Sequence, residues 1–160
     1  MTIIRRVVVL AAFAFWQGGF TFYAAVVVPI GTDVLGSAAE QARITRRVTV
    51  AMNLAGLAAI AIFAADVALE PNYRRSRAVV LFGITALLVG LIALRAHLDA
   101  LFHGAEAYVA DRGVFRPWHR LYLWLSTAQW AACVGFLALT LAAWFPRNGS
   151  PRPPKSPSVS

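Results

Sequence analysis

The chain has 160 residues, of which 59% are hydrophobic and only 14% are charged, and its mean hydropathy is +0.65. This composition excludes an ordinary soluble globular domain, in which about 25% of the residues are charged. The formal net charge is +8, but the cationic side chains lie between apolar runs and form no continuous basic face, which argues against a nucleic-acid partner. The composition instead predicts a membrane protein with its cations at the membrane edges, where they meet the lipid bilayer.

Four apolar runs are long enough, or nearly long enough, to cross the roughly 30 Å hydrocarbon core of a bilayer. The first follows Arg5 and Arg6 and is too long for the apolar part of a signal peptide, so we interpret it as a span. The fold class is therefore all-α, a four-helix transmembrane bundle with up-down-up-down order. The predicted spans of this membrane domain, residues 1–145, cover residues 7–30, 48–69, 78–102 and 121–145.

Two segments outside the spans carry signals of their own. Between the first two spans, Ser37 is followed three residues later by Glu40, which is the capping-box pattern of a helix N-terminus. We therefore expect the second helix to begin near Ser37, ahead of its membrane-spanning part. The C-terminal segment 146–160, PRNGSPRPPKSPSVS, is rich in Pro and Ser and cannot bury enough apolar surface to fold. We expect it to be a disordered tail.

The distribution of Lys and Arg favours one orientation in the membrane. Four spans place both chain termini on the same side. With the termini in the cytoplasm, eight Lys and Arg side chains lie there and six lie on the other side, with Arg95 at the membrane edge. The positive-inside rule then predicts a multi-pass protein of a bacterial inner (plasma) membrane with both termini cytoplasmic.

Each span carries a stripe of small or polar residues at helical spacing, which is typical of helices that pack together in lipid. We expect the four stripes to face one another. Their polar members, expected in the bundle interior, are Gln17, Asn53, Tyr122, Ser126 and Gln129. The full stripes are Ala14, Gly18, Thr21 and Ala25 with Gln17 beside them; Thr49, Asn53 and Gly56; Gly83, Ala86, Gly90, Ala93 and His97; and His119, Tyr122, Ser126, Gln129 and Cys133.

The stretch LRAHLDALFHG closes the third span and contains several groups able to carry charge. At 100° per residue, Arg95, Asp99 and His103 share one helix face, whereas His97 lies about 200° from Arg95. We interpret Arg95 and Asp99 as a mutually neutralising pair at the membrane edge. His97 continues the small-residue stripe of the third span and is expected to point into the bundle.

A histidine inside a bundle can bind a metal ion, ligate haem or carry a proton near neutral pH. His97 and His119 are the candidate cofactor ligands, because small membrane cytochromes hold haem between helices through two axial histidines. A lone structural His97 is the alternative. The spacing of the histidines and carboxylates matches no metal motif, and the chain contains no GxSxG, P-loop, HExxH or GxGxxG sequence.

The segment FWQGGFTFYAAVVVP in the first span, together with the four-span layout, resembles small uncharacterised bacterial four-helix membrane proteins of domain-of-unknown-function type. The resemblance implies the fold and the location and transfers no site. We expect a small non-enzymatic membrane module that forms a homo-oligomer or serves as a partner of a larger complex. The alternatives are a haem- or metal-binding redox protein that uses His97 and His119, and a small transporter with an aqueous path past Gln17, Asn53 and Gln129.

Overall fold

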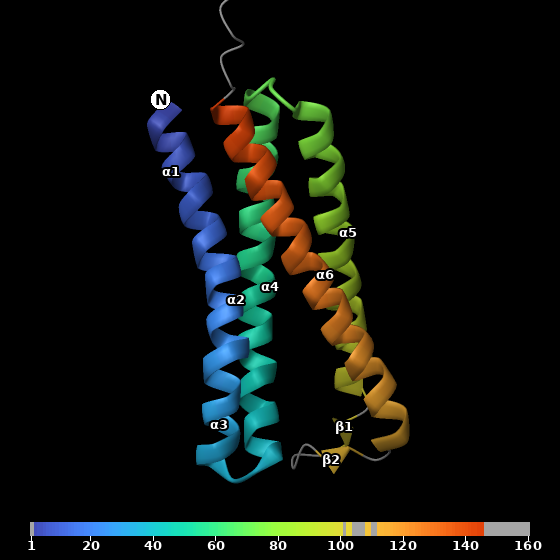
Figure 1. Ribbon diagram of the computed structural model, residues 1–160. Helices are drawn as coiled ribbons and strands as arrows, with labels where there is room; N and C mark the ends of the chain where they lie inside the picture. Colours follow the sequence, from blue (N-terminus) through green and yellow to red (C-terminus); the bar gives the residue numbers. More distant parts are fainter. Residues whose placement is uncertain (1, 101, 104–107, 110–111, 146–160) are drawn as a thin grey trace, which may run out of the picture.

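The computed structural model describes residues 2–100, 102–103, 108–109 and 112–145. Four long helices run in alternating directions through this part of the chain (Figure 1). The first of them contains two π-helical turns. In chain order the elements are α1 (Thr2–Phe13), η1 (Ala14–Gly18), α2 (Gly19–Phe22), η2 (Tyr23–Val27), α3 (Val28–Leu35), α4 (Ala38–Leu69), α5 (Arg74–Ala100) and α6 (Arg112–Trp144).

All four long helices are apolar enough to cross a membrane, over Ile3–Leu35, Glu40–Leu69, Arg74–Ala100 and Phe115–Trp144. The all-α four-helix prediction is thereby confirmed, and the chain is a multi-pass membrane protein. The start of α1 and the end of α6 lie together at one end of the molecule, which we call the terminus end (Figure 1). The distal end contains the α3–α4 junction, the last turns of α5 and the first turns of α6.

The helix boundaries follow local sequence signals. Gly36 ends α3 in the left-handed region, with φ of +60°, where glycine has no steric penalty. Ser37 then caps α4, and its Oγ accepts a hydrogen bond from the backbone N–H of Glu40 at 3.4 Å, as the capping-box pattern predicted. The helix α5 ends at Ala100 rather than at residue 102, because the chain enters strand β1 (Phe102–His103), which pairs antiparallel with β2 (Tyr108–Val109). The tail 146–160 lies outside the described residues.

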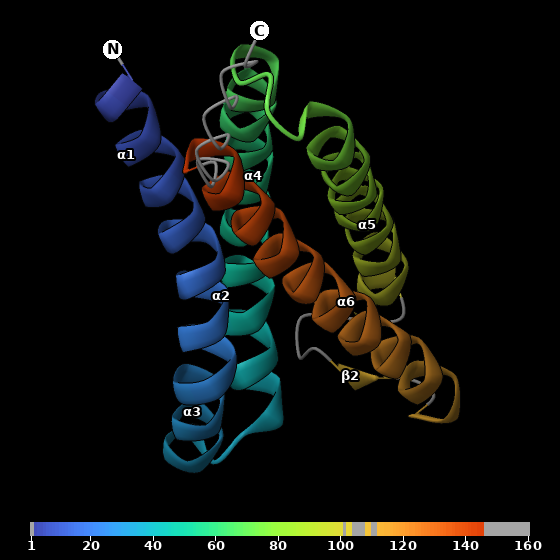
Figure 2. The same cartoon turned by 45° about the horizontal axis from the view of Figure 1, so that its top comes forward.

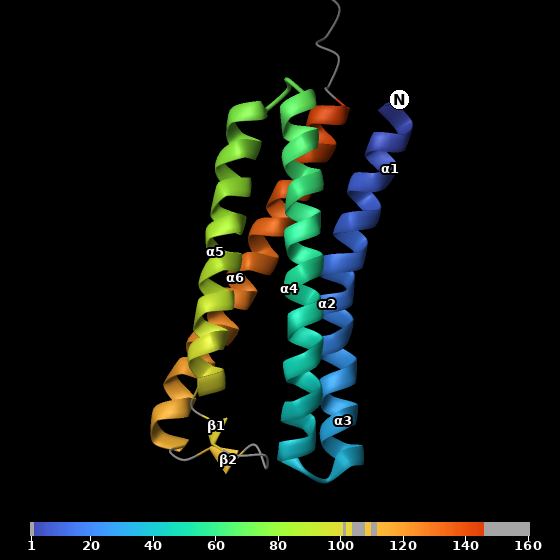
Figure 3. The same ribbon diagram turned by 180° about the vertical axis from the view of Figure 1, so that it is seen from behind.

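The first helix and α4 pack closely because glycines leave room for large side chains. A Cβ added to Gly56 would stand 2.7 Å from the indole Cε2 of Trp16, so the ring occupies the space above this glycine. Nearer the distal end, Tyr23 donates a hydrogen bond to the Thr45 hydroxyl at 2.8 Å. These contacts join the two helices along most of their length (Figure 3).

The hydrophobic core lies toward the terminus end and takes side chains from all four helices. Phe63 of α4 and Phe136 of α6 meet at its centre, with ring centroids 5.1 Å apart. The α5 face of the core consists of large aliphatic side chains, because these give more dispersion contact with α6 than small ones. The buried apolar members are Val9, Trp16, Ala59, Phe63, Val67, Leu81, Ile84, Leu88, Cys133, Phe136 and Trp144.

The small-residue stripes therefore do not all face inward. The expectation is correct for part of the second and fourth stripes, where Gly56, Ser126, Gln129 and Cys133 are buried. Thr49, Asn53 and Tyr122 are partly buried, and His119 is exposed. The expectation is wrong for the third helix, whose stripe lies on the face opposite the leucines, with Ala86, Ala93 and His97 exposed. It is also wrong for the first helix, where Ala14, Gly18, Thr21 and Ala25 are exposed and only Gln17 beside them is buried.

The helices α4 and α5 lie close together near the terminus end and diverge toward the distal end (Figure 3). The helix α6 runs obliquely, from the top of α1 and α4 to the lower part of α5 (Figure 2). This divergence leaves the polar ends of α4, α5 and α6 facing one another at the distal end.

Candidate functional site

The terminus end is held together by four charged side chains and one hydroxyl group, which we call the terminus cluster: Arg5, Asp66, Glu70, Arg77 and Thr140. The Asp66 carboxylate is buried and forms ion pairs with Arg77 and with Arg5, the latter at 3.0 Å. Arg5 also reaches Glu70 at 2.9 Å, and Arg77 donates to the Thr140 hydroxyl at 3.2 Å. The cluster thus connects α1, α4, α5 and α6. Each of its carboxylates is paired with an arginine, which is the arrangement of a structural clamp, although Arg77 Nη1 has no hydrogen-bond partner among the described residues.

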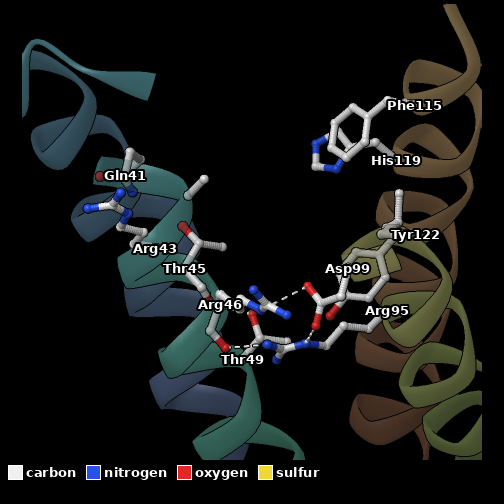
Figure 4. Close-up of a pocket in the computed structure, with 12 residues that line it drawn as sticks. Gln41, Arg43, Thr45, Arg46, Thr49, Arg95, Asp99, Phe115, His119 and Tyr122 are labelled. Atoms are coloured by element: carbon white, nitrogen blue, oxygen red, sulfur yellow. Dashed lines mark hydrogen bonds and ion pairs between the residues drawn. The ribbon is translucent and has the colours of Figure 1, made fainter. Parts of the chain in front are cut away.

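The distal end contains a cleft with a volume of about 380 Å³, between α4 on one side and α5 with α6 on the other (Figure 4). We call it the distal cleft. Charged and hydroxyl groups share its walls with Ala42, Leu98 and Phe115. The lining residues are Gln41, Ala42, Arg43, Thr45, Arg46, Thr49, Arg95, Leu98, Asp99, Phe115, His119 and Tyr122.

Three charged side chains bridge the two walls of the distal cleft (Figure 4). The Asp99 carboxylate accepts a hydrogen bond from Arg95 Nε at 3.5 Å and forms an ion pair with Arg46 Nε at 3.3 Å. Arg95 also donates through Nη2 to the backbone carbonyl of Arg46. Its third nitrogen, Nη1, is buried and has no hydrogen-bond partner among the described residues. One carboxylate is therefore shared by two guanidinium groups from different helices.

The distal cleft lies at one end of three of the four helices that are apolar enough to cross a membrane. Its residues lie in the first turns of the α4 and α6 spans and in the last turns of the α5 span. Trp118 and Trp124 are exposed on α6 at the same level, as is typical of indoles in the headgroup region. We therefore expect the cleft at the level where lipid headgroups and water meet.

The structure does not bring the two predicted cofactor ligands into one site. His97 is exposed, contrary to the expectation that it points into the bundle, and its ring packs edge-on against Trp118 at 4.7 Å between centroids. His119 lines the distal cleft and stacks on Phe115 at 5.4 Å. Among the described residues, no three His, Cys, Asp or Glu side chains are close enough to share a metal ion. His103 is among the residues whose side chains the structure does not describe.

The predicted polar interior is distributed over two regions. Tyr122 is half-buried in the distal cleft, and Ser126, one turn deeper, donates to its backbone carbonyl at 2.8 Å. Gln17 and Gln129 are buried further along the bundle, and Gln129 Nε2 has no hydrogen-bond partner among the described residues. Asn53 is partly buried on α4. Gln17, Gln129 and Asn53 do not line the distal cleft.

The sequence reading missed Arg46, Arg95 and Asp99 as members of one site. The prediction that Arg95 and Asp99 share a helix face and that His97 lies on another face is correct. However, the Arg95 and Asp99 face points toward the other helices, and the His97 face points outward. One sequence signal indicates this site. If the second helix begins at Ser37, Arg46 lies on that helix at the same level as the polar end of the third helix. Asp66 was likewise visible as an acidic residue inside the predicted span 48–69.

Comparison with protein-family models, with curated proteins and with solved structures finds no match for this chain. The chemistry of the distal cleft follows from its own groups. Arginine stays protonated and cannot act as an acid or a base at neutral pH, so Arg46 and Arg95 are suited to binding rather than to bond cleavage.

Proposed function

We propose that this protein is a small, non-catalytic membrane module that binds a ligand in the distal cleft. The observation that carries the proposal is the cleft itself, whose volume of about 380 Å³ lies within the 300–1,000 Å³ range of small-molecule sites. It combines apolar walls with a few convergent polar groups, which is the usual composition of such sites.

We propose further that the module resides in a bacterial inner membrane with both termini cytoplasmic. The support is the distribution of cations, with eight Lys and Arg side chains on the terminus side and six on the distal side, to which Arg95 at the membrane edge adds a seventh. In this orientation the distal cleft opens to the side of the membrane opposite the cytoplasm.

The proposal is tested by filling the cleft. Ala42 lines the cleft on α4, so Ala42→Trp places an indole inside it. Ala51→Trp is the matched control, because Ala51 is exposed on the same helix and does not line the cleft. The full-length protein and both variants are purified in mild uncharged detergent and examined by native mass spectrometry for bound small molecules.

We expect the wild type and Ala51→Trp to retain the same bound mass and Ala42→Trp to lose it. Retention of the same bound mass by Ala42→Trp contradicts a ligand in the distal cleft. A wild-type protein without any specific adduct, under conditions in which added lipids and small amphiphiles also fail to bind, contradicts it too.

A further inference from the structure

We infer that the ligand of the distal cleft is an acidic phospholipid, held by its phosphate, and that Asp99 occupies the phosphate position while the cleft is empty. This inference rests on the proposed ligand-binding function and names the chemical class of the ligand. It follows from the charge of the lining, from the unsatisfied arginine and from the level of the cleft in the membrane.

The lining of the distal cleft carries an excess of positive charge. Among the described residues, two arginines on the gap, Arg46 and Arg95, face one carboxylate, Asp99, whereas the Arg43 side chain points away from the gap (Figure 4). The guanidinium groups of Arg46 and Arg95 point into the gap between the walls (Figure 4). Guanidinium groups bind phosphate through paired N–H donors, and such charge-assisted hydrogen bonds are stronger than neutral ones.

The donors of Arg95 exceed the acceptors that the described residues supply. Its side chain is 11% exposed, its Nε and Nη2 bond to Asp99 and to the Arg46 carbonyl, and its buried Nη1 has no partner among the described residues. A buried donor without an acceptor is costly, and a ligand oxygen that accepts from it removes that cost. An anion with several oxygens therefore fits this position better than a neutral molecule.

The surroundings favour a lipid phosphate over a dissolved one. The cleft lies at the ends of three membrane spans, at the level of the exposed Trp118 and Trp124. Leu98 and Phe115 give its walls apolar surface that the glycerol and upper acyl carbons of a lipid can cover. A zwitterionic headgroup is disfavoured, because its ammonium group would lie among the arginines.

Asp99 supplies the internal anion that such a ligand replaces. Its carboxylate is shared by Arg46 and Arg95, the two arginines that would hold the phosphate, and it is 27% exposed. A bound phosphate and the Asp99 carboxylate repel each other and compete for the same donors. Removing the charge of Asp99 should therefore strengthen phosphate binding, whereas removing either arginine should weaken it.

The experiment measures binding to delipidated full-length protein in uncharged detergent, by titration with native mass spectrometry. The three probes are short-chain phosphatidylglycerol, phosphatidylcholine with the same acyl chains, and water-soluble glycerol phosphate. The variants are Arg46→Gln, Arg95→Gln and Asp99→Asn. Arg47→Gln is the matched control, since it removes the same charge from the adjacent exposed residue, which does not line the cleft.

We expect the wild type to bind phosphatidylglycerol at least tenfold more tightly than phosphatidylcholine. Arg46→Gln and Arg95→Gln should each weaken this binding by about tenfold, the usual effect of losing a charge-assisted hydrogen bond, and Arg47→Gln should change it by less than about twofold. Asp99→Asn should tighten it by about threefold to tenfold. Arg46 is half-exposed, so Arg46→Gln remains informative even if Arg95→Gln fails to fold.

Three results overturn the inference. Equal binding of the two lipids, unchanged by the arginine variants, shows that the ligand is not an anion, although a ligand in the cleft would stand. Glycerol phosphate binding as tightly as phosphatidylglycerol identifies a soluble phosphate as the ligand. Weaker phosphatidylglycerol binding by a folded Asp99→Asn variant shows that Asp99 supports the site rather than competing for it.

Discussion

Single residues decide how closely the first helix approaches α4. Trp16 is 4% exposed, and its indole lies against Gly56, where a Cβ would meet three ring atoms within 3 Å. The missing side chain of Gly56 is therefore what lets the largest side chain of the first helix be buried. Other glycines, such as Gly90 on α5, have no atom within 4 Å of an added Cβ and serve no such purpose in the isolated chain.

We predict that Gly56→Ala destabilises the protein and that Gly90→Ala does not. Overpacking costs about 1–3 kcal/mol, which exceeds the roughly 1 kcal/mol that alanine gains over glycine in a helix. Thermal unfolding in detergent, followed by circular dichroism, should give Gly56→Ala a lower Tm than the wild type and Gly90→Ala an equal or higher one. Equal Tm values for the two variants would show that Trp16 moves aside without cost.

At the scale of elements, the two π-helical turns explain why the first helix departs from its expected face. A π turn contains one residue more than an α-helical turn. It therefore rotates the side-chain directions of all following residues by about 100° around the helix axis. The positions Ala14, Gly18, Thr21 and Ala25 align only in an uninterrupted helix, so η1 and η2 remove the predicted stripe. Trp16 and Gln17, inside η1, are buried instead.

The terminus cluster joins the helices through charge, and Asp66 is the group on which it depends. Asp66→Asn leaves the fully buried Arg77 and the partly buried Arg5 side by side without their shared counterion. We predict a loss of about 3–5 kcal/mol in the free energy of unfolding, the usual cost of breaking a buried ion pair. The measurement is unfolding by titration with sodium dodecyl sulfate in detergent micelles.

The control for Asp66→Asn is Asp33→Asn, which removes an exposed carboxylate from α3 and should change the free energy of unfolding by no more than about 0.5 kcal/mol. The double variant Asp66→Leu/Arg77→Leu should recover part of the loss, because it removes the uncompensated charge. If Asp66→Asn unfolds like Asp33→Asn, the terminus cluster contributes no stability.

For the whole molecule, the two ends differ in character: ion pairs close the terminus end, and the distal end contains the cleft. The start of α1 and the end of α6 lie at the closed end (Figure 1). Ser76, at the start of α5, is exposed at the terminus end, and Thr32, near the end of α3, is exposed at the distal end. The two positions should therefore lie on opposite sides of a membrane.

We predict that cysteines at these positions differ in their access to a membrane-impermeant maleimide in whole cells. In a Cys133→Ala background, Thr32→Cys should react in intact cells, and Ser76→Cys should react only after the membrane is opened, because the termini are proposed to be cytoplasmic. The reverse pattern would invert the proposed orientation while keeping the four spans. Reaction of both positions in intact cells would contradict the spans themselves.

The length and position of the apolar runs were enough to predict the four helices, because the thickness of a bilayer fixes how many apolar residues a span needs. The capping box at Ser37 predicted the start of α4, because its hydrogen bonds are local. The pairing of Arg95 with Asp99, and their separation from His97, also followed from helix geometry alone.

Only the tertiary structure decided which face of each helix is inward. In lipid, apolar and small side chains are equally acceptable outside, so hydrophobicity does not orient a helix as it does in water. On α5 the leucines pack inward and the small residues face out, which turns His97 outward and brings Arg95 and Asp99 opposite Arg46. The distal cleft arises from this orientation and from the divergence of α4 and α5. Neither is a property of any single helix, and each depends on contacts between residues far apart in the chain.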